Sequence, residues 1–189
     1  AIYVVAGGYM ATVINDFIQG IIMLGGIVVI VVASLRQFGG LSQAMLSLAQ
    51  VTDTTLSEAP GIFTSFFGPQ PFNLICVVIL TSLGTWSLPQ MTQKFYAIKN
   101  ENAIVKGSVI STLFAFVVAG GCYFLGGFGR LLSDKVDVAT QGYDAIIPTM
   151  FQSFSPLLIS LVVILVLSAS MSTLSSLVLT ASSTLTLDF

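Results

Sequence analysis

Residues 145–187 contain no charged side chain, and hydroxylated residues recur within them at helical spacing. About 20 consecutive apolar residues cross the hydrocarbon core of a bilayer, so this stretch predicts a membrane-spanning helix with its flanks. At 100° per residue, one stripe of this helix is small or hydroxylated. The stripe comprises Ala169, Ser172, Thr173, Ser176, Thr180 and Ser183, with Ser168 and Ser175 along its edge. Such a stripe can hold a hard cation, but small and hydroxylated residues also serve close helix packing.

The composition of the whole chain also points to the membrane. Of its 189 residues, 55% are hydrophobic and only 7% are charged, whereas soluble domains have about 25% charged residues. We therefore predict an all-α integral membrane protein. Histidine is absent, and Cys76 and Cys122 stand singly in apolar runs, so neither a transition-metal site nor a catalytic pair is indicated. We expect no enzyme activity, no cofactor and no binding to nucleic acid.

Uncharged runs predict four spans within a single membrane domain, at about residues 13–35, 71–92, 107–129 and 156–186. The polar segments between them are predicted loops, at about residues 36–70, 93–106 and 130–144, the first with a short amphipathic helix near 41–48. Lys94, Lys99 and Lys106 place the middle loop in the cytoplasm by the positive-inside tendency, and the other two loops outside. Topology and attraction to anionic lipid are the simplest roles for these lysines. The chain begins at Ala1 without a basic leader, which we interpret as an internal fragment of a larger carrier.

Asp16 stands at the start of the first span, with Thr12 and Gln19 on the same helical face. A carboxylate at the edge of a spanning helix is costly to bury and usually faces an aqueous path or a partner. Alternatively, Asn15 and Asp16 mark an ordinary helix N-terminus, where they interact favourably with the helix dipole. Both interpretations stay open at this point.

Three segments resemble, in order and spacing, parts of the sodium:solute symporter family. These segments are residues 7–20 (GGYMATVINDFIQG), 83–90 (LGTWSLPQ) with 94–99 (KFYAIK), and 167–176 (LSASMSTLSS). The resemblance covers essentially the whole chain, and the serine-rich segment is its most specific part. It implies a fragment of an inverted-repeat secondary transporter of five plus five helices, in which this chain supplies the fifth to eighth core helices.

The same resemblance implies sodium sites on the fourth span. The principal site would take the Ala169 carbonyl and the Ser172 and Thr173 hydroxyls, completed by carbonyls of a helix upstream of this chain. A second site, present in some members only, would use Asp16, Ser172, Ser175 and Ser176. Oxygen ligands suit sodium because it is a hard cation, and a carboxylate offsets its charge in a low-dielectric bundle.

On the second span, the resemblance implies substrate contacts from Thr81, Thr85, Trp86 and Gln90. Gly84 permits close approach or unwinding there, and Pro89 removes a backbone donor and frees a carbonyl one turn earlier. Trp86 has an alternative role as an anchor at the lipid headgroups. The glycine pairs at 25–26, 120–121 and 126–127 lack the context of a phosphate loop, and we interpret them as close-packing positions or hinges.

Altogether, the resemblance implies sodium-coupled symport of a small organic solute by alternating access, across the cytoplasmic membrane of a bacterium. The expected solute is an amino acid, an organic acid or a vitamin, and the expected partners are sodium, this solute and lipid. The identity of the solute, the number of sodium ions, proton coupling and the oligomeric state stay open. Two alternatives come from other classes of protein: a symporter-like sensor module of a signalling protein, and a passive cation pathway lined by the hydroxyl stripe.

Overall fold

The computed structural model describes residues 2–52, 60–86, 88–96, 98, 100–132, 136 and 138–187. In these residues all regular structure is helical, which confirms the predicted all-α class. The helices are α1 (Ile2–Gln37), α2 (Leu41–Gln50), α3 (Pro71–Gly84), α4 (Pro89–Tyr96), α5 (Glu101–Gly127), α6 (Val138–Gln141), α7 (Ile146–Phe151) and α8 (Pro156–Leu187). Three 3₁₀ turns accompany them, η1 (Ile62–Thr64), η2 (Phe128–Leu132) and η3 (Tyr143–Ala145).

In the part of the chain that the structure describes, three helices, α1, α5 and α8, are long and apolar enough to cross a membrane. The second predicted span, residues 71–92, is instead divided between α3, which is apolar but has only 14 residues, and the short helix α4. Pro89 begins α4, as expected for a residue whose ring fixes φ and which lacks the N–H that a first helical position leaves unpaired. The sequence signals at Gly84 and Pro89 therefore coincide with the ends of two separate helices.

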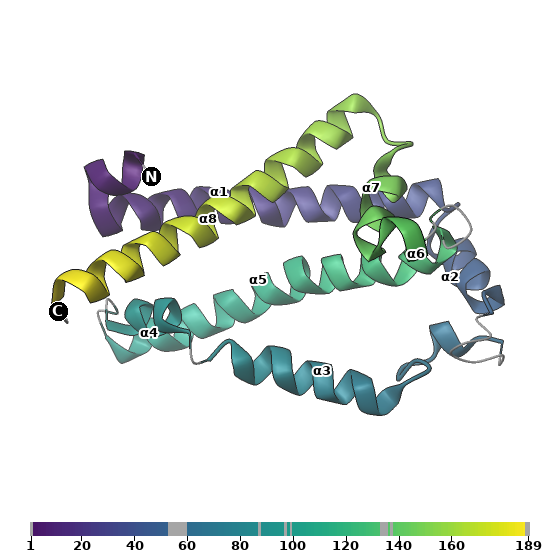
Figure 1. The fold of residues 1–189 in the computed structure, drawn as a ribbon, viewed down its shortest axis with the longest axis horizontal. Helices are drawn as coiled ribbons and strands as arrows, with labels where there is room; N and C mark the ends of the chain where they lie inside the picture. The colour runs from purple at the N-terminus through teal and green to yellow at the C-terminus, as the bar shows by residue number, and fades with distance from the viewer. Residues whose placement is uncertain are drawn as a thin grey trace.

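Helices α1 and α8 run antiparallel and cross each other, and α5 lies beside α1 (Figure 1). The close approach of α1 depends on glycines. A Cβ on Gly26 would lie 2.5 Å from Cδ2 of Leu165 in α8, and a Cβ on Gly121 of α5 would lie 2.8 Å from Cγ1 of Ile27. Small residues at such crossings allow helix backbones to approach closely in membranes.

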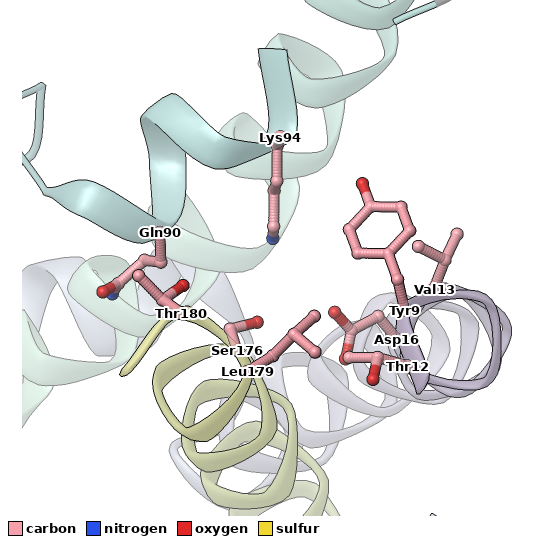
Figure 2. A pocket seen from close by; sticks show the side chains of 9 residues that line it. All are labelled: Tyr9, Thr12, Val13, Asp16, Gln90, Lys94, Ser176, Leu179 and Thr180. Carbon is pink, nitrogen blue, oxygen red and sulfur yellow. The ribbon is translucent and has the colours of Figure 1, made fainter. Parts of the chain in front are cut away.

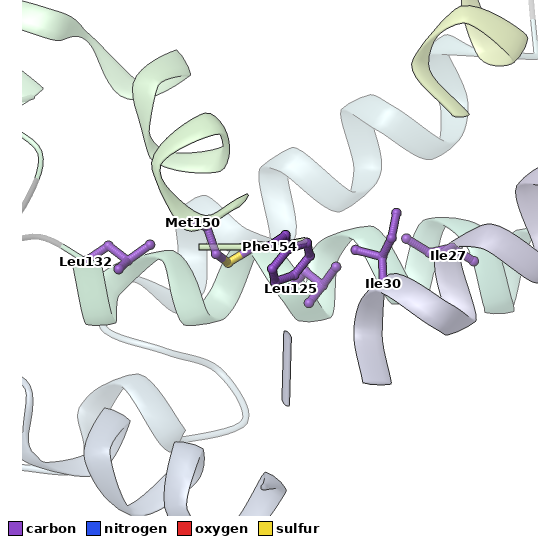
Figure 3. Packing of buried hydrophobic residues seen from close by; sticks show 6 residues of the cluster. All are labelled: Ile27, Ile30, Leu125, Leu132, Met150 and Phe154. Carbon is purple, nitrogen blue, oxygen red and sulfur yellow. The ribbon is translucent and has the colours of Figure 1, made fainter. Parts of the chain in front are cut away.

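The apolar core lies where α1, α5 and α7 meet, at the end of the long helices farthest from the two termini (Figures 1 and 3). Ile27 and Ile30 of α1 pack there with Leu125 of α5 and with Met150 and Phe154. Helix α3 differs, because every one of its residues is exposed and it stands apart from the other long helices (Figure 1). An apolar helix with no buried face is typical of a segment that lies in a membrane or against further helices.

Candidate functional site

A cavity of about 230 Å³ lies near the termini, between α1, α4 and α8 (Figure 2). Its walls combine polar and apolar side chains from three helices that are far apart in the sequence: Tyr9, Thr12, Val13 and Asp16 of α1, Gln90 and Lys94 of α4, and Ser176, Leu179 and Thr180 of α8. Three residues that the resemblance assigned to ion or substrate sites, Asp16, Gln90 and Ser176, thus share one cavity with Thr12 and Thr180, which the sequence pattern also singled out. We take it as the candidate functional site.

The α1 wall follows a break in the helix at Gly8. Gly8 has φ 55° and ψ −146°, a conformation that glycine adopts at little cost because it has no Cβ. Thr12, which is only 3% exposed, donates a hydrogen bond from its hydroxyl to the Gly8 carbonyl at 3.1 Å. The residues of α1 that line the cavity all follow this break in the sequence.

One turn after Thr12, Oδ1 of Asp16 is buried and has no hydrogen-bond partner within the described part of the chain. Oε1 of Gln19, a residue only 7% exposed, is in the same situation. A buried polar atom without a partner costs free energy, and a charged one costs most. These two oxygens therefore leave acceptor capacity in the α1 face that a cation or an external donor would satisfy.

On α8, the hydroxyl stripe is partly turned toward the protein interior. Ser168, Ser175 and Thr180 are buried, and Ser172 and Ser176 are half-buried. The Ser175 hydroxyl donates to the Met171 carbonyl at 2.7 Å. The buried face is centred nearer Ser175 and Ser168 than the sequence pattern suggests, because α1 packs against that side of α8.

The residues predicted for the principal sodium site do not all face the same way. Ser172 is half-buried, whereas Thr173 is exposed, since neighbouring residues of a helix are 100° apart. The Thr173 hydroxyl donates to the Ala169 carbonyl at 3.0 Å, so these two oxygens lie side by side. Within this chain, α1 cannot cover both the Ser172 side and the Thr173 side of α8.

The residues predicted for the second sodium site are closer to a common location. Asp16 and Ser176 line the cavity together, from α1 and α8 respectively. Ser175 is buried and Ser172 is half-buried on α8, but neither is among the described residues that line the cavity. The cavity therefore brings together the carboxylate and one of the three hydroxyls.

The substrate candidates are separated by the break between α3 and α4. Gln90 of α4 is half-buried and lines the cavity. Thr81 and Thr85 are exposed, and their hydroxyls donate to the carbonyls of Val77 and Ser82 at 2.8 and 3.1 Å. Trp86 is 77% exposed. These three side chains lie away from the cavity.

Sequence reasoning did not assign Lys94 or Tyr9 to the site. The sequence predicts roles for Lys94 in topology and in attraction to anionic lipid, but its side chain extends into the cavity (Figure 2). The one signal available was its spacing from Gln90, because residues four apart share a helical face. The contact of α4 with α8 that completes the cavity joins residues far apart in the sequence, and no local pattern records it.

Comparison with known proteins identifies the family. The family model for the sodium:solute symporter family matches residues 1–189. A sodium/pantothenate symporter of Haemophilus influenzae is 27% identical over 184 residues, covering 96% of this chain and 36% of the relative. The sodium/proline symporter 2 of Staphylococcus saprophyticus is 27% identical over 188 residues, covering 99% of this chain and 35% of the relative.

The chain thus spans about a third of the length of these curated relatives. No solved structure matches it significantly. The family match over all 189 residues confirms the resemblance drawn from the serine-rich helix and the segments around Asp16 and Gln90. The chain belongs to the sodium:solute symporter family.

Proposed function

We propose that the protein containing this chain couples the entry of sodium to the uptake of a small organic solute across the cytoplasmic membrane of a bacterium. Family membership over the whole chain carries the proposal. The structure supports it with a cavity in which a carboxylate on α1 faces hydroxylated residues on α8. Sodium, the coupling ion, would be transported together with the solute.

The chemistry of the cavity suits a small hard cation. Oδ1 of Asp16 lacks a donor in the described residues, and the hydroxyls of Thr12, Ser176 and Thr180 stand around the same space. Oxygen atoms are the ligands that hard cations prefer, and a carboxylate offsets the charge that a low-dielectric interior would otherwise resist. On this basis we propose a second sodium site at Asp16 and Ser176. The family resemblance adds Ser172 and Ser175, which lie outside the cavity wall.

The principal sodium site would use Ala169, Ser172 and Thr173 and would need oxygens from another helix. The Thr173 hydroxyl beside the Ala169 carbonyl supports this assignment, because Thr173 belongs to an exposed side of α8. In inverted-repeat transporters, broken helices supply backbone carbonyls of this kind at the membrane midplane. We propose such a five-plus-five architecture, with alternating access produced by rocking of the bundle.

The substrate that we propose is an amino acid or an organic acid, including acidic vitamins. The relatives are named for pantothenate and proline, both of which carry a carboxylate. Gln90 can offer amide donors to such a group from the cavity wall, while Thr81, Thr85 and Trp86 present a second polar surface on the exposed side of α3 and its C-terminal turn. Reciprocal coupling between sodium and solute of about 1–3 kcal/mol would suffice for symport.

The test is uptake into vesicles that carry the full-length protein, with and without an inward sodium gradient. The labelled panel contains proline, pantothenate, a simple carboxylate and a sugar. We expect sodium-dependent accumulation of proline, pantothenate or the carboxylate. Sodium binding without accumulation of any compound would favour the sensor module instead, and sodium flux without coupled solute would favour the passive pathway; either result would overturn the proposal.

A further inference from the structure

Lys94 extends from α4 into the same cavity that Asp16 lines from α1 (Figure 2). Among the described side chains that line the walls, these two are the charged ones. Within the described residues no ion pair joins them, and Oδ1 of Asp16 has no partner. The structure thus holds an ammonium and a carboxylate on different walls of one small cavity, and Oδ1 of this carboxylate has no partner in the described residues.

Two features of Lys94 suit it to act on the cavity without being fixed there. Its side chain is a compact point charge on a flexible four-carbon stem, and the residue as a whole is exposed. It also belongs to a helix of only eight residues that begins at Pro89 and packs against α8. The ammonium can therefore approach or leave Asp16 without displacement of α1 or α8.

Electrostatics then makes sodium and Lys94 competitors. Each is a single positive charge attracted to the same carboxylate, and like charges beside one carboxylate repel each other. An ion beside Asp16 favours withdrawal of the ammonium, and departure of the ion leaves a carboxylate that the ammonium can neutralise. An isolated carboxylate in a low-dielectric space has a high free energy, and the Lys94 ammonium avoids that state by pairing with it.

We propose that Lys94 is a built-in countercharge that replaces sodium at Asp16 and so promotes its release from this end of the α1–α8 pair. The inference rests on the proposed function, in which Asp16 is an ion ligand. It adds a residue from outside the predicted ligand sets, located on α4. Lys94 in this role lowers the affinity for sodium in the state that releases the ion.

The test measures binding of radioactive sodium to the purified full-length protein, together with sodium-driven uptake in proteoliposomes. Lys94→Gln should tighten apparent sodium affinity at least about fivefold, the lower end of ordinary coupling between two sites, and should slow turnover because release is delayed. Lys94→Arg keeps the charge and should resemble the parent. Lys106→Gln is the matched control, because Lys106 is exposed on α5 and does not line the cavity.

A second substitution shows whether the effect acts through Asp16. Asp16→Asn alone should weaken sodium binding, and in that background Lys94→Gln should change sodium affinity little. Equal effects of Lys94→Gln and Lys106→Gln, or an undiminished effect of Lys94→Gln in the Asp16→Asn background, would overturn the inference. A parent protein that shows sodium-driven uptake with a silent Lys94→Gln would refute this inference alone, whereas a parent without such uptake would refute the proposed function.

Discussion

Ser172 and Thr173 are neighbours in the sequence but face different sides of α8. Ser172 is turned toward the interface with α1, and Thr173 is exposed with its hydroxyl on the Ala169 carbonyl. A stripe used only for packing against α1 would involve the first residue and not the second. The two residues therefore distinguish ion binding from helix packing.

We expect Ser172→Ala and Thr173→Ala, each in the full-length protein, to raise the sodium concentration for half-maximal uptake by roughly tenfold. The loss of one ligand oxygen corresponds to about 1–2 kcal/mol, and 1.4 kcal/mol is a factor of ten. Ser182→Ala is the control, because Ser182 is exposed on α8 outside the predicted stripe. Sodium titrations of uptake measure all three variants. If Thr173→Ala behaves like Ser182→Ala, the stripe serves packing and the ligand assignment fails.

Single residues also show what the sequence could not reveal about the site. The shared face of Thr12, Asp16 and Gln19 could be predicted from their spacing, because all three belong to one helix. The presence of Lys94 in the site could not be predicted, because it depends on a contact between α4 and α8. These two helices are separated in the sequence by α5 and the loops that follow it. The exposure of Thr173 likewise depends on where α1 crosses α8, which helical periodicity alone does not determine.

At the scale of elements, glycine positions control how α1 packs. A Cβ on Gly26 would meet three side-chain atoms of Leu165 at 2.5 to 3.0 Å, whereas a Cβ on the adjacent Gly25 would have nothing within 4 Å. The sequence indicated the pair as a close-packing site but could not say which of the two glycines makes the contact. Which glycine makes the contact depends on the direction from which α8 approaches α1.

We expect Gly26→Val to destabilise the full-length protein by about 1–3 kcal/mol through overpacking. Gly25→Val is the matched control, with the same change in side chain and in helix propensity but open space around the new Cβ. Thermal unfolding in detergent measures both variants. Leu165→Ala should restore much of the loss when it is combined with Gly26→Val, because the two residues share one contact. Equal destabilisation by the two valines would contradict this packing.

Element boundaries were predictable where one local signal dominated. The short helix expected near residues 41–48 is α2, and the start of α8 at Pro156 coincides with the expected start of the fourth span. The second span was less predictable, because hydropathy treats residues 71–92 as one stretch while the backbone divides between α3 and α4. Apolar composition specifies burial in a membrane, but Gly84 and Pro89 decide whether the helix continues.

For the molecule as a whole, the composition indicated the membrane, because so few charges do not suit a soluble domain. The uncharged runs, long enough to cross a bilayer as helices, indicated the all-α class. The inverted-repeat architecture cannot be read from these residues, since the chain spans only about a third of its relatives and a repeat needs both halves. The exposed apolar surface of α3 suits contact with lipid or with further helices. Helix α3 has few neighbours within this chain against which its position could be predicted.

The orientation of the helices in the membrane determines whether the cavity opens toward the cytoplasm or toward the outside. Helix α2 and the start of α5 lie at opposite ends of the long helices, and the cavity with Asp16 and Lys94 is at the α5-start end (Figure 1). The lysines of the 93–106 segment predict that this end faces the cytoplasm. If so, the Lys94 countercharge acts where sodium leaves.

Cysteine labelling measures this orientation directly. In the full-length protein with all native cysteines replaced, including Cys76 and Cys122, single cysteines are placed at Gln50 and Glu101, both exposed. In right-side-out vesicles, a membrane-impermeant thiol reagent should modify Gln50→Cys and spare Glu101→Cys. In inside-out vesicles, the pattern should reverse. The opposite result would place the cavity at the outer surface, where release promoted by Lys94 would oppose uptake rather than complete it.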